Sequence, residues 1–520
     1  MRVLLINPPY QTLTSNLGVG HQVPLGLLSV GGPLLDAGHE VRLLDAECLH
    51  LDSPGILRAV RCFGPALVMT GHAGSTPAHP VCIEMLNAIK AACPHVTTVY
   101  GGVYPTYHAE KILHNEKAVD VIVRGEGEVT ATELVAVLAA GGDKNLATVA
   151  GLAFRRCAQV IVTSTRAPIE QLGAYRVGWE LIQDWDCYQC FGLGRAAIVQ
   201  FSRGCPHRCT YCGQHGFWVS WRHRDPVELV NEIRWLCLTH DVRFITLADE
   251  NPTTLRPVWT QFLMELASRR LPVSLFATIR ATDIVRDADL LPLYRKAGIL
   301  YVLLGVDSTD REVLQRIHKC STPRHDVEAC RLLREHDIFS VLGHVVGFAE
   351  ETRASLRAIQ TRLTAYEADW LNAMYVTPHS WTEFGRQARG QTVIEPDQRC
   401  WDYRHQVLGQ KYLKRWQLFF WVKWMELWFH LRPHRLRAIL RTRDRFRRRQ
   451  LLWVLLHTGL VWLGEVLEFL GNSLGMRFHR ASRKDRSPHK FMRSFSRLKV
   501  SALKKIGSLI EKDIATTSLG

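Results

Sequence analysis

Short apolar runs alternate with helix-length amphipathic segments along the first 150 residues. Apolar runs of this length that end in small or polar residues are typical of buried parallel strands. The pattern predicts strands at 3–7, 41–45, 67–71, 96–101 and 119–124, with helices such as 25–37 and 81–92 between them. Alternating strands and helices favour a doubly wound, Rossmann-like α/β domain over residues 1–150, whose ligand crevice lies beyond the carboxyl ends of the strands.

The same alternation returns after a connector at 151–195, within which 151–162 has the pattern of a small hairpin. Strands are predicted at 196–202, 244–249, 273–279, 300–306, 338–345 and 371–377, with helices such as 226–238, 287–297 and 324–336. Six such strands predict a partial (β/α)6 TIM-type barrel over residues 196–390, with reactive side chains at the carboxyl ends of the strands.

The remaining chain has a different pattern, and we expect a helical region at 391–475 and a basic tail at 476–520. Tryptophans recur at helical spacing in 416–431, an arginine-rich segment fills 432–449, and an apolar run occupies 451–464. That run is too short to span a bilayer, so we expect no transmembrane helix. Two alternatives stay open: an interfacial helix on an anionic membrane, or a helical lid over the mouth of the barrel.

Composition and charge indicate the cellular compartment and the kinds of partner to expect. The chain has 14 cysteines and starts directly with a strand-like segment, so we expect a reducing cytoplasm and metal or redox use of the thiols. The net charge of +16 is concentrated after residue 410. Such a tail suits nucleic acid or an anionic membrane face. We expect no nucleic-acid partner, since the tail is its only support, and a location that is cytoplasmic or peripheral to a membrane.

Three cysteines in a short loop carry the chemistry. Cys205, Cys209 and Cys212 have the spacing C-x3-C-x2-C directly after the predicted strand 196–202. Three thiolates converging from one loop suit an iron–sulfur cluster, and the missing fourth thiolate leaves one iron open. The competing interpretation is three incidental thiols in a cysteine-rich chain. A second pair, Cys187 and Cys190, could ligate a metal or form a redox couple, but no matching pair follows, so we interpret it as structural.

With an aromatic residue before its last cysteine, this loop resembles that of the radical S-adenosylmethionine (SAM) enzymes. In that family the open iron of a 4Fe–4S cluster chelates SAM, whose reductive cleavage yields a 5′-deoxyadenosyl radical. The resemblance implies that Asp249 and Glu250 contact the SAM amino group and that Arg280 and Asp307 hold its carboxylate and ribose. The glycine-glycine-glutamate pattern common in the family is replaced here by LADEN. Salt bridges at the barrel mouth are the alternative role for these four side chains.

The first domain extends the resemblance to the cobalamin-dependent branch of the family. The motifs INPP, GG-x-x-P-T and RGEGE occur in that order before the cysteine loop. D-x-H-x-x-G is absent, so we expect cobalamin to bind without a protein histidine, with His72 as the alternative lower ligand. The expected cobalamin contacts are Asn7, Pro8, His72, Gly74, Ser75, Gly101, Gly102, Arg124, Gly125 and Glu126.

Longer matches across residues 1–470 resemble the magnesium-tetrapyrrole branch of this family. They imply an oxidoreductase that closes the isocyclic ring of a (bacterio)chlorophyll precursor with oxygen from water, fed by a low-potential donor such as ferredoxin or flavodoxin. A cobalamin-dependent radical methyltransferase and a non-catalytic tetrapyrrole or corrinoid carrier are the alternatives.

Histidines and tryptophans near the barrel are candidates for contacts with the pigment. Imidazoles suit magnesium ligation or acid–base work, and indoles suit stacking on a macrocycle. The candidates are His207, His215, His223, His344, His379, Trp218 and Trp221.

Overall fold

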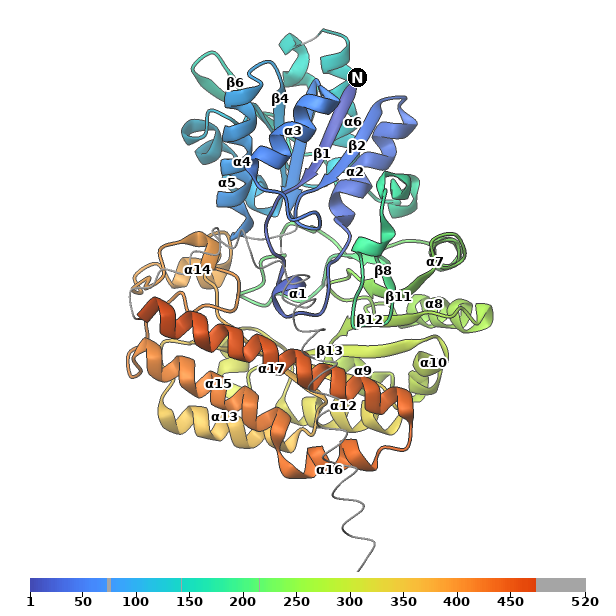
Figure 1. Cartoon of the computed structure of the whole chain (residues 1–520), viewed down its shortest axis with the longest axis vertical. Coiled ribbons are helices and arrows are strands. Elements are labelled where there is room, and N and C mark those ends of the chain that lie inside the picture. Colours follow the sequence, from blue (N-terminus) through green and yellow to red (C-terminus); the bar gives the residue numbers. More distant parts are fainter. Residues whose placement is uncertain (73–75, 142, 215, 474–520) are drawn as a thin grey trace, which may run out of the picture. The chain divides into compact units, whose positions relative to one another are not determined.

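Two parallel sheets organise the computed structural model, which describes residues 1–72, 76–141, 143–214 and 216–473 (Figure 1). Residues 1–461 form one compact unit and residues 462–520 a second. Both sheets and two of the regions expected from the sequence, the Rossmann-like domain and the barrel, therefore lie within the first unit.

The N-terminal sheet has seven strands in the order β2-β1-β3-β4-β5-β6-β7. The first five are parallel and confirm the predicted strands: β1 (Arg2–Asn7), β2 (Glu40–Asp45), β3 (Leu67–His72), β4 (Thr97–Gly102) and β5 (Val121–Val123). The hairpin β6 (Leu152–Arg156) and β7 (Gln159–Val162) then pairs antiparallel with β5. This sheet therefore continues beyond residue 150, because the hairpin satisfies backbone groups that β5 would otherwise leave unpaired at an edge.

Helices cover both faces of this sheet. Val3 and Leu5 belong to one core cluster, with residues of α2 and α6, whereas Leu4 and Ile6 belong to another, with residues of α3, α4 and α5. The period of two along β1 is what a strand buried on both faces requires. The elements around this sheet are α1 (Leu13–Asn16), α2 (Leu25–Asp36), α3 (Ser53–Phe63), α4 (Ala78–Ala92), α5 (Val103–Asn115), α6 (Gly127–Ala139) and η1 (Asp143–Thr148).

The second sheet is a six-stranded parallel sheet in the order β15-β14-β13-β12-β11-β8. Its strands confirm the predicted barrel: β8 (Arg195–Val199), β11 (Val242–Leu247), β12 (Ser274–Ile279), β13 (Ile299–Asp307), β14 (Phe339–Val346) and β15 (Trp370–Tyr375). Short 3-10 turns lead into it: η2 (Leu172–Ala174), η3 (Trp179–Leu181) and η4 (Trp185–Cys187). A small antiparallel ribbon, β9 (Ser202–Arg203) and β10 (Arg222–His223), follows β8.

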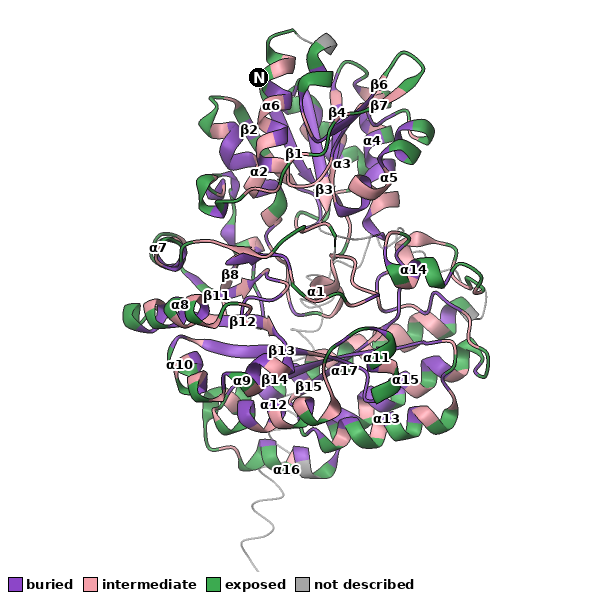
Figure 2. Ribbon diagram, turned by 180° about the vertical axis from the view of Figure 1, so that it is seen from behind, coloured by how far each residue is buried: buried purple, intermediate pink, exposed green. Residues whose placement is uncertain are grey.

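Helices pack outside this barrel, and Figure 2 shows its strands mainly buried and the outer helix surfaces largely exposed. Their inward residues, such as Leu263 and Leu333, share a core cluster with Val302 and Leu342 of the sheet. The helical elements are α7 (Pro226–His240), α8 (Arg256–Arg269), α9 (Ala281–Arg286), η5 (Ala288–Leu290), α10 (Leu291–Lys296), α11 (Arg311–Arg316), α12 (Pro323–Glu335) and α13 (Arg353–Ala365).

The C-terminal region is helical as predicted, with α14 (Glu383–Gln387), η6 (Gln398–Cys400), α15 (Arg415–Leu431), α16 (Pro433–Arg441) and α17 (Arg445–Ser473). The first part of α17 packs against the amino ends of the barrel strands, where Leu451 and Val454 join Phe244 and Tyr301 in one apolar cluster. Gln450 accepts a hydrogen bond of 3.0 Å from the Tyr301 hydroxyl at the same place.

The apolar run at 451–464 lies in a helix that is much longer than the run itself. By length and composition alone, Arg445–Asn472 could cross a membrane, and 17% of its apolar window is buried. The sequence expectation counted only the uninterrupted apolar residues, whereas the helix continues through Glu465 and Glu468. Length is therefore no argument against a span.

Candidate functional site

The three predicted cysteines lie in the segment between β9 and β10, and residues 204–214 are called the cluster loop below. All three cysteines lie outside disulfides and are partly exposed. The loop leaves β9 through Gly204, which has φ +91°, and a Cβ there would meet Ser220 O at 2.5 Å. Only glycine adopts this turn without strain or collision. Thr210 N then donates to Ile317 O at 3.1 Å, which attaches the middle of the loop to the barrel.

The surroundings of the thiols suit a negatively charged centre. Burial raises the pKa of Cys205 and Cys209, while the positive charge of Arg280 acts in the opposite direction on both. Lys319 adds to this effect at Cys209. Cations beside a thiol favour the thiolate that iron binds. Cysteines outside disulfides and next to buried cations therefore fit an iron–sulfur cluster.

No group of three or more His, Cys, Asp or Glu side chains within the described residues could hold a single metal ion. The cluster loop does not conflict with this observation. A zinc ion draws its ligands to within ~2.3 Å of one point, whereas an iron–sulfur cluster fills the space between its thiolates.

A buried charge network adjoins the cluster loop. Tyr211, between Cys209 and Cys212, donates its hydroxyl hydrogen to Asp307 at 2.6 Å. Lys319 Nζ lies 2.5 Å from the same carboxylate. Arg280 Nη2 donates to Lys319 O at 2.5 Å, and Arg280 Nε has no hydrogen-bond partner. Arg280 and Asp307 thus lie beside the cluster loop, with Asp307 already engaged and one Arg280 donor available, and their contacts with SAM stay a prediction. Sequence reasoning missed Lys319, which is far from any motif.

The carboxylates after β11 have different surroundings. Asp249 accepts hydrogen bonds from Phe201 N at 3.1 Å, from Ser202 Oγ at 2.6 Å and from Ser202 N, and so fixes the turn between β8 and β9. Glu250 accepts from Gly204 N at 3.2 Å and lies close enough to Cys205 to affect its pKa. Burial raises the pKa of each carboxyl group to about 7. Glu250 is therefore the carboxylate that borders the cluster loop.

The crevice predicted from the sequence would lie at the carboxyl ends of β1, β3 and β4. His72, at the end of β3, has a buried Nδ1 without a hydrogen-bond partner, and burial lowers its pKa. Gly102 has φ +107°, and a Cβ there would meet His72 O at 2.8 Å. The glycines at 101–102 thus permit β3 and β4 to approach each other. A neutral imidazole whose Nδ1 is free at the end of a strand fits a flat ligand such as a corrin ring.

Other predicted cobalamin residues have partners of their own. Asn7 Nδ2 donates to Asp45 Oδ1 at 2.8 Å. Arg124 donates to Thr163 O and to Thr165 Oγ1, each at 3.1 Å. Pro8 follows β1. Gly125 N donates to Thr106 Oγ1 at 3.0 Å. Gly74 and Ser75 lie outside the described residues. The role of these residues as cobalamin contacts stays a prediction.

The two glutamates of the RGEGE motif, Glu126 and Glu128, form salt bridges with arginines that flank the cluster loop. Glu126 Oε2 lies 2.8 Å from Arg203 Nη1, and Glu126 Oε1 lies 2.7 Å from Arg222 Nη2. Glu128 Oε1 lies 2.5 Å from Arg203 Nη2. The Glu126 carboxylate, expected at cobalamin, is thus occupied by two guanidinium groups.

A buried acidic cluster at the end of β2 was missed by the sequence analysis. His21 Nε2 lies 3.0 Å from Asp45 and His21 Nδ1 lies 3.6 Å from Glu47. Tyr188 donates its hydroxyl hydrogen to Asp45 at 2.9 Å. Burial opposes the charge on His21, but the hydrogen bonds to Asp45 and Glu47 prevail and raise its pKa to about 9. The acidic residue at the end of the predicted strand 41–45 was the sequence signal from which this cluster could have been predicted.

Of the histidine candidates, His379 and His344 are the most buried. His379 Nδ1 lies 2.8 Å from Thr76 Oγ1 and His379 Nε2 lies 2.8 Å from the Tyr403 hydroxyl. Neither nitrogen of His344 has a partner. Burial lowers the pKa of both imidazoles to about 4, so both are neutral.

The other candidates are less enclosed. His207 and His223 are partly exposed, and His215 lies outside the described residues. Arg203 covers the Trp218 ring at 5.1 Å, and Trp221 Nε1 donates to Asn251 O at 3.0 Å. Both indoles thus have contacts within the protein, and their stacking on a macrocycle stays a prediction.

Cys187 and Cys190 have separate partners. Cys187 Sγ donates to Asp184 at 3.6 Å, and Cys190 Sγ donates to His21 O at 3.7 Å. The structural role predicted for this pair stays a prediction.

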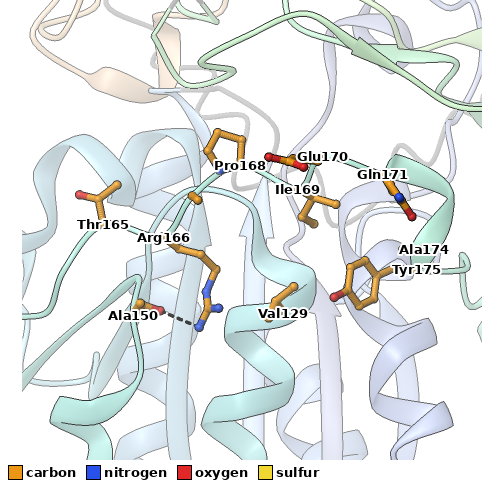
Figure 3. Close-up of a pocket in the computed structure, with 11 residues that line it drawn as sticks. Val129, Ala150, Thr165, Arg166, Pro168, Ile169, Glu170, Gln171, Ala174 and Tyr175 are labelled. Carbon is orange, nitrogen blue, oxygen red and sulfur yellow. Dashed lines mark hydrogen bonds between the residues drawn. The ribbon is translucent and has the colours of Figure 1, made fainter.

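A separate pocket lies between α6 and the chain at 165–175 (Figure 3). Arg166 reaches into it and donates to Ala150 O at 3.2 Å. None of the predicted site residues lines it. It therefore plays no part in the arrangement around the cluster loop.

Comparison with known proteins agrees with this geometry. The radical SAM superfamily model matches residues 199–363, and the B12 binding domain model matches residues 18–135. The chain is 44% identical over 470 residues to the anaerobic magnesium-protoporphyrin IX monomethyl ester cyclase of Synechocystis sp., covering 90% of this chain and 93% of that protein. It is 33% identical over 384 residues to the Rubrivivax gelatinosus protein of the same name, covering 73% and 68%.

A solved structure has the same fold. It is the radical SAM methyltransferase TsrM from Kitasatospora setae with cobalamin and a [4Fe-4S] cluster bound. The TM-score is 0.61 at 19% identity, and the match covers 76% of each chain. The pairing of a Rossmann-like domain with a partial barrel is therefore shared with an enzyme that binds both groups.

Proposed function

Because the chain belongs to the family of the anaerobic magnesium-protoporphyrin IX monomethyl ester cyclases, we propose that it forms the isocyclic ring of (bacterio)chlorophyll. The substrate would be magnesium-protoporphyrin IX 13-monomethyl ester and the product protochlorophyllide, with the new oxygen drawn from water. The observation that carries the proposal is a loop with three cysteines outside disulfides, flanked by buried cations and joined to a Rossmann-like sheet within one compact unit.

The family uses a 4Fe–4S cluster, SAM and cobalamin, which supply radical hydrogen abstraction and electron transfer when bound. We propose that Cys205, Cys209 and Cys212 ligate the cluster. Glu250 is suited to the SAM amino group, because its carboxylate borders the cluster loop. Arg280 is suited to the SAM carboxylate through its unpartnered Nε.

Asp249 and Asp307 would act next to these two contacts. Asp249 fixes the backbone that leads into the cluster loop. Asp307 holds Tyr211 of the loop and Lys319 of the barrel. These contacts keep the loop in place while other groups react, which is the main task of a protein whose cofactors carry the hard chemistry.

Cobalamin would occupy the crevice at the strand ends of the N-terminal sheet. We propose that His72 faces this ligand as a neutral side chain, with Asn7, Pro8, Gly101, Gly102, Arg124 and Gly125 along the rim. We also propose a low-potential donor, such as ferredoxin or flavodoxin, as the source of electrons, because reductive cleavage of SAM requires one.

Anaerobic turnover in oxygen-18 water tests the reaction. The mixture contains the magnesium-protoporphyrin monomethyl ester, SAM, cobalamin and a low-potential reductant, and mass spectrometry identifies the pigment. We expect a labelled ketone that requires cobalamin and disappears in Cys209→Ala. A pigment that gains a methyl group without label would assign the protein to the cobalamin-dependent methyltransferases, the second candidate. Unchanged pigment beside cleaved SAM would reject the substrate.

We further propose that α15 contacts an anionic membrane. Trp416, Phe420, Trp424 and Trp428 recur every fourth residue on this helix and are between 40% and 53% exposed. Exposed arginines follow directly: Arg437, Arg441, Arg443, Arg445, Arg448 and Arg449. Indoles at the headgroup level together with arginines suit an interfacial helix on acidic lipid.

Vesicle flotation tests this contact. The wild-type protein should float with vesicles that contain phosphatidylglycerol and remain below with neutral vesicles. Trp424→Ala combined with Trp428→Ala should abolish flotation. Trp235→Ala is the matched control, because Trp235 is 43% exposed on α7. Equal flotation of all variants would reject the membrane contact of α15.

A further inference from the structure

The cluster loop is joined to the N-terminal domain immediately before its first cysteine. Arg203 ends β9, and Cys205 is two residues further on. The Arg203 guanidinium lies 2.8 Å from Glu126 and 2.5 Å from Glu128, while Arg222 of β10 lies 2.7 Å from Glu126. These four side chains, called the clamp below, are at most 10% exposed.

The clamp is balanced in charge, with two carboxylates and two guanidinium groups. Paired, buried charges tolerate little displacement, because moving one partner leaves the other uncompensated in a low dielectric. Arg222 Nη1 also donates to Ile169 O at 2.5 Å, and Arg203 Nε donates to Gln200 at 2.9 Å. The hydrogen bonds around the clamp thus fix the guanidinium planes, which fixes the start of the cluster loop.

A second junction lies at the other end of the cluster loop. Trp381 Nε1 donates to Gly213 O at 2.8 Å, next to Cys212. The Trp381 ring stacks on Tyr107 of α5, with centroids 5.4 Å apart and an interplanar angle of 4°. Helix α5 follows β4, and α6, which carries Glu128, follows β5. Both ends of the cluster loop are therefore held by elements that begin at the strand ends of the proposed cobalamin crevice.

We infer that Glu126 and Glu128 are positioning residues: they fix the cluster loop relative to the cobalamin crevice, and Glu126 does not contact cobalamin. This inference rests on the proposed function, and it predicts how efficiently SAM cleavage is converted into product. When the clamp is broken, SAM still binds and is still cleaved, but the radical forms at a variable distance from the second cofactor. Misplacement of reacting groups by about 1 Å can cost about 100-fold in rate.

The test uses Glu128→Gln and Glu126→Gln in the full-length holoenzyme, each of which leaves part of the clamp in place. We expect unchanged iron content and cobalamin dissociation constant, and about 100-fold more SAM cleaved per product formed than in wild type. Glu133→Gln is the matched control. Glu133 lies on the same helix and pairs with Arg166 of the connector rather than with the barrel. It should leave the ratio unchanged.

A readout independent of turnover is the distance between Co(II) and the reduced cluster, measured by pulsed electron paramagnetic resonance. The distribution should be narrow in wild type and in Glu133→Gln, and broad in both clamp variants. A weaker cobalamin affinity in Glu126→Gln with an unchanged distance would overturn the inference and make Glu126 a ligand contact. An unchanged ratio of SAM cleaved to product would also overturn it.

The experiments distinguish a failure of the proposed function from a failure of the inference about the clamp. The product of the wild-type enzyme reports on the substrate, whereas the distance distribution reports on the clamp whichever product forms. If neither glutamine variant folds, Arg203→Lys keeps the charge but loses the two separate nitrogens that reach Glu126 and Glu128, and it should broaden the same distribution.

Discussion

Tyr211 and Asp307 are joined by a hydrogen bond of 2.6 Å that connects the cluster loop to the end of β13. Tyr211 is the aromatic residue between the last two cysteines, and Asp307 has φ +58° at the end of its strand. The same carboxylate receives Lys319, so one acidic group organises both the loop and the buried cation beside Cys209. Changes at this junction should therefore affect how firmly the cluster is held.

Tyr211→Phe should loosen the cluster without abolishing it. The hydrogen bond goes to a charged group, and such bonds contribute about 1.5–3 kcal/mol, so iron should be released roughly tenfold faster or more. The measurement is the rate of iron loss to a chelator under anaerobic conditions. Tyr412→Phe is the control, because Tyr412 is 65% exposed. Equal rates for the two variants would contradict the prediction.

Cys209→Ala should prevent assembly of the iron–sulfur cluster, since two thiolates cannot hold it as three do. The reconstituted variant should lack the cluster's electron paramagnetic resonance signal after reduction. Cys157→Ala removes an exposed thiol on the hairpin of the N-terminal sheet and should retain the full signal. A normal signal in Cys209→Ala would remove this residue from the ligand set.

Lys319→Met should destabilise the fold. Lys319 is buried with its ammonium group 2.5 Å from Asp307, and removing one partner of a buried pair costs about 3–5 kcal/mol. Denaturant unfolding of the apoprotein measures the loss. Lys411→Met removes a lysine whose side chain is 64% exposed and 3.9 Å from Glu350, and it should cost less than about 1 kcal/mol.

His21 should make the free energy of unfolding fall as the pH rises into the alkaline range. Its folded pKa of about 9 lies above the ordinary 6.5, so its contribution is fully present below pH 6.5 and is lost as pH rises through 9. The shift corresponds to about 3 kcal/mol at most. Unfolding free energies at pH 6.5 and 9.5 should differ by less in His21→Gln than in wild type. An identical pH dependence would refute the role of His21.

Asp326 makes the stability of the fold depend on pH in the acidic to neutral range. Burial raises its folded pKa to about 8, and neither carboxylate oxygen has a hydrogen-bond partner. The folded state therefore keeps a proton that the unfolded chain releases near pH 3.8, and stability falls as pH rises from 4 to 8. Asp326→Asn cannot ionise, so its stability advantage over wild type should grow across this interval. A constant difference would show that Asp326 does not titrate there.

Periodic apolar runs were sufficient to predict both sheets, because each strand is a local pattern with a period or a length of its own. The cysteine loop was equally visible, since its chemistry lies within eight consecutive residues. The partners of Glu126 were not, because Arg203 is 77 residues away and its side chain carries no pattern. Asp249 looked like a ligand residue, yet it binds the backbone of residues 201–202, a contact that depends on how β8 and β11 pair.

The first turns of α17 close one end of the barrel. Its side chains occupy the amino ends of the strands, and Gln450 is hydrogen-bonded to Tyr301 inside. The amino ends of the strands are thereby closed by side chains of the protein, so a substrate of the proposed reaction would enter and leave at the carboxyl ends, beside the cluster loop. A truncation ahead of residue 450 should remove this closure, expose Phe244 and Tyr301 to water and destabilise the barrel.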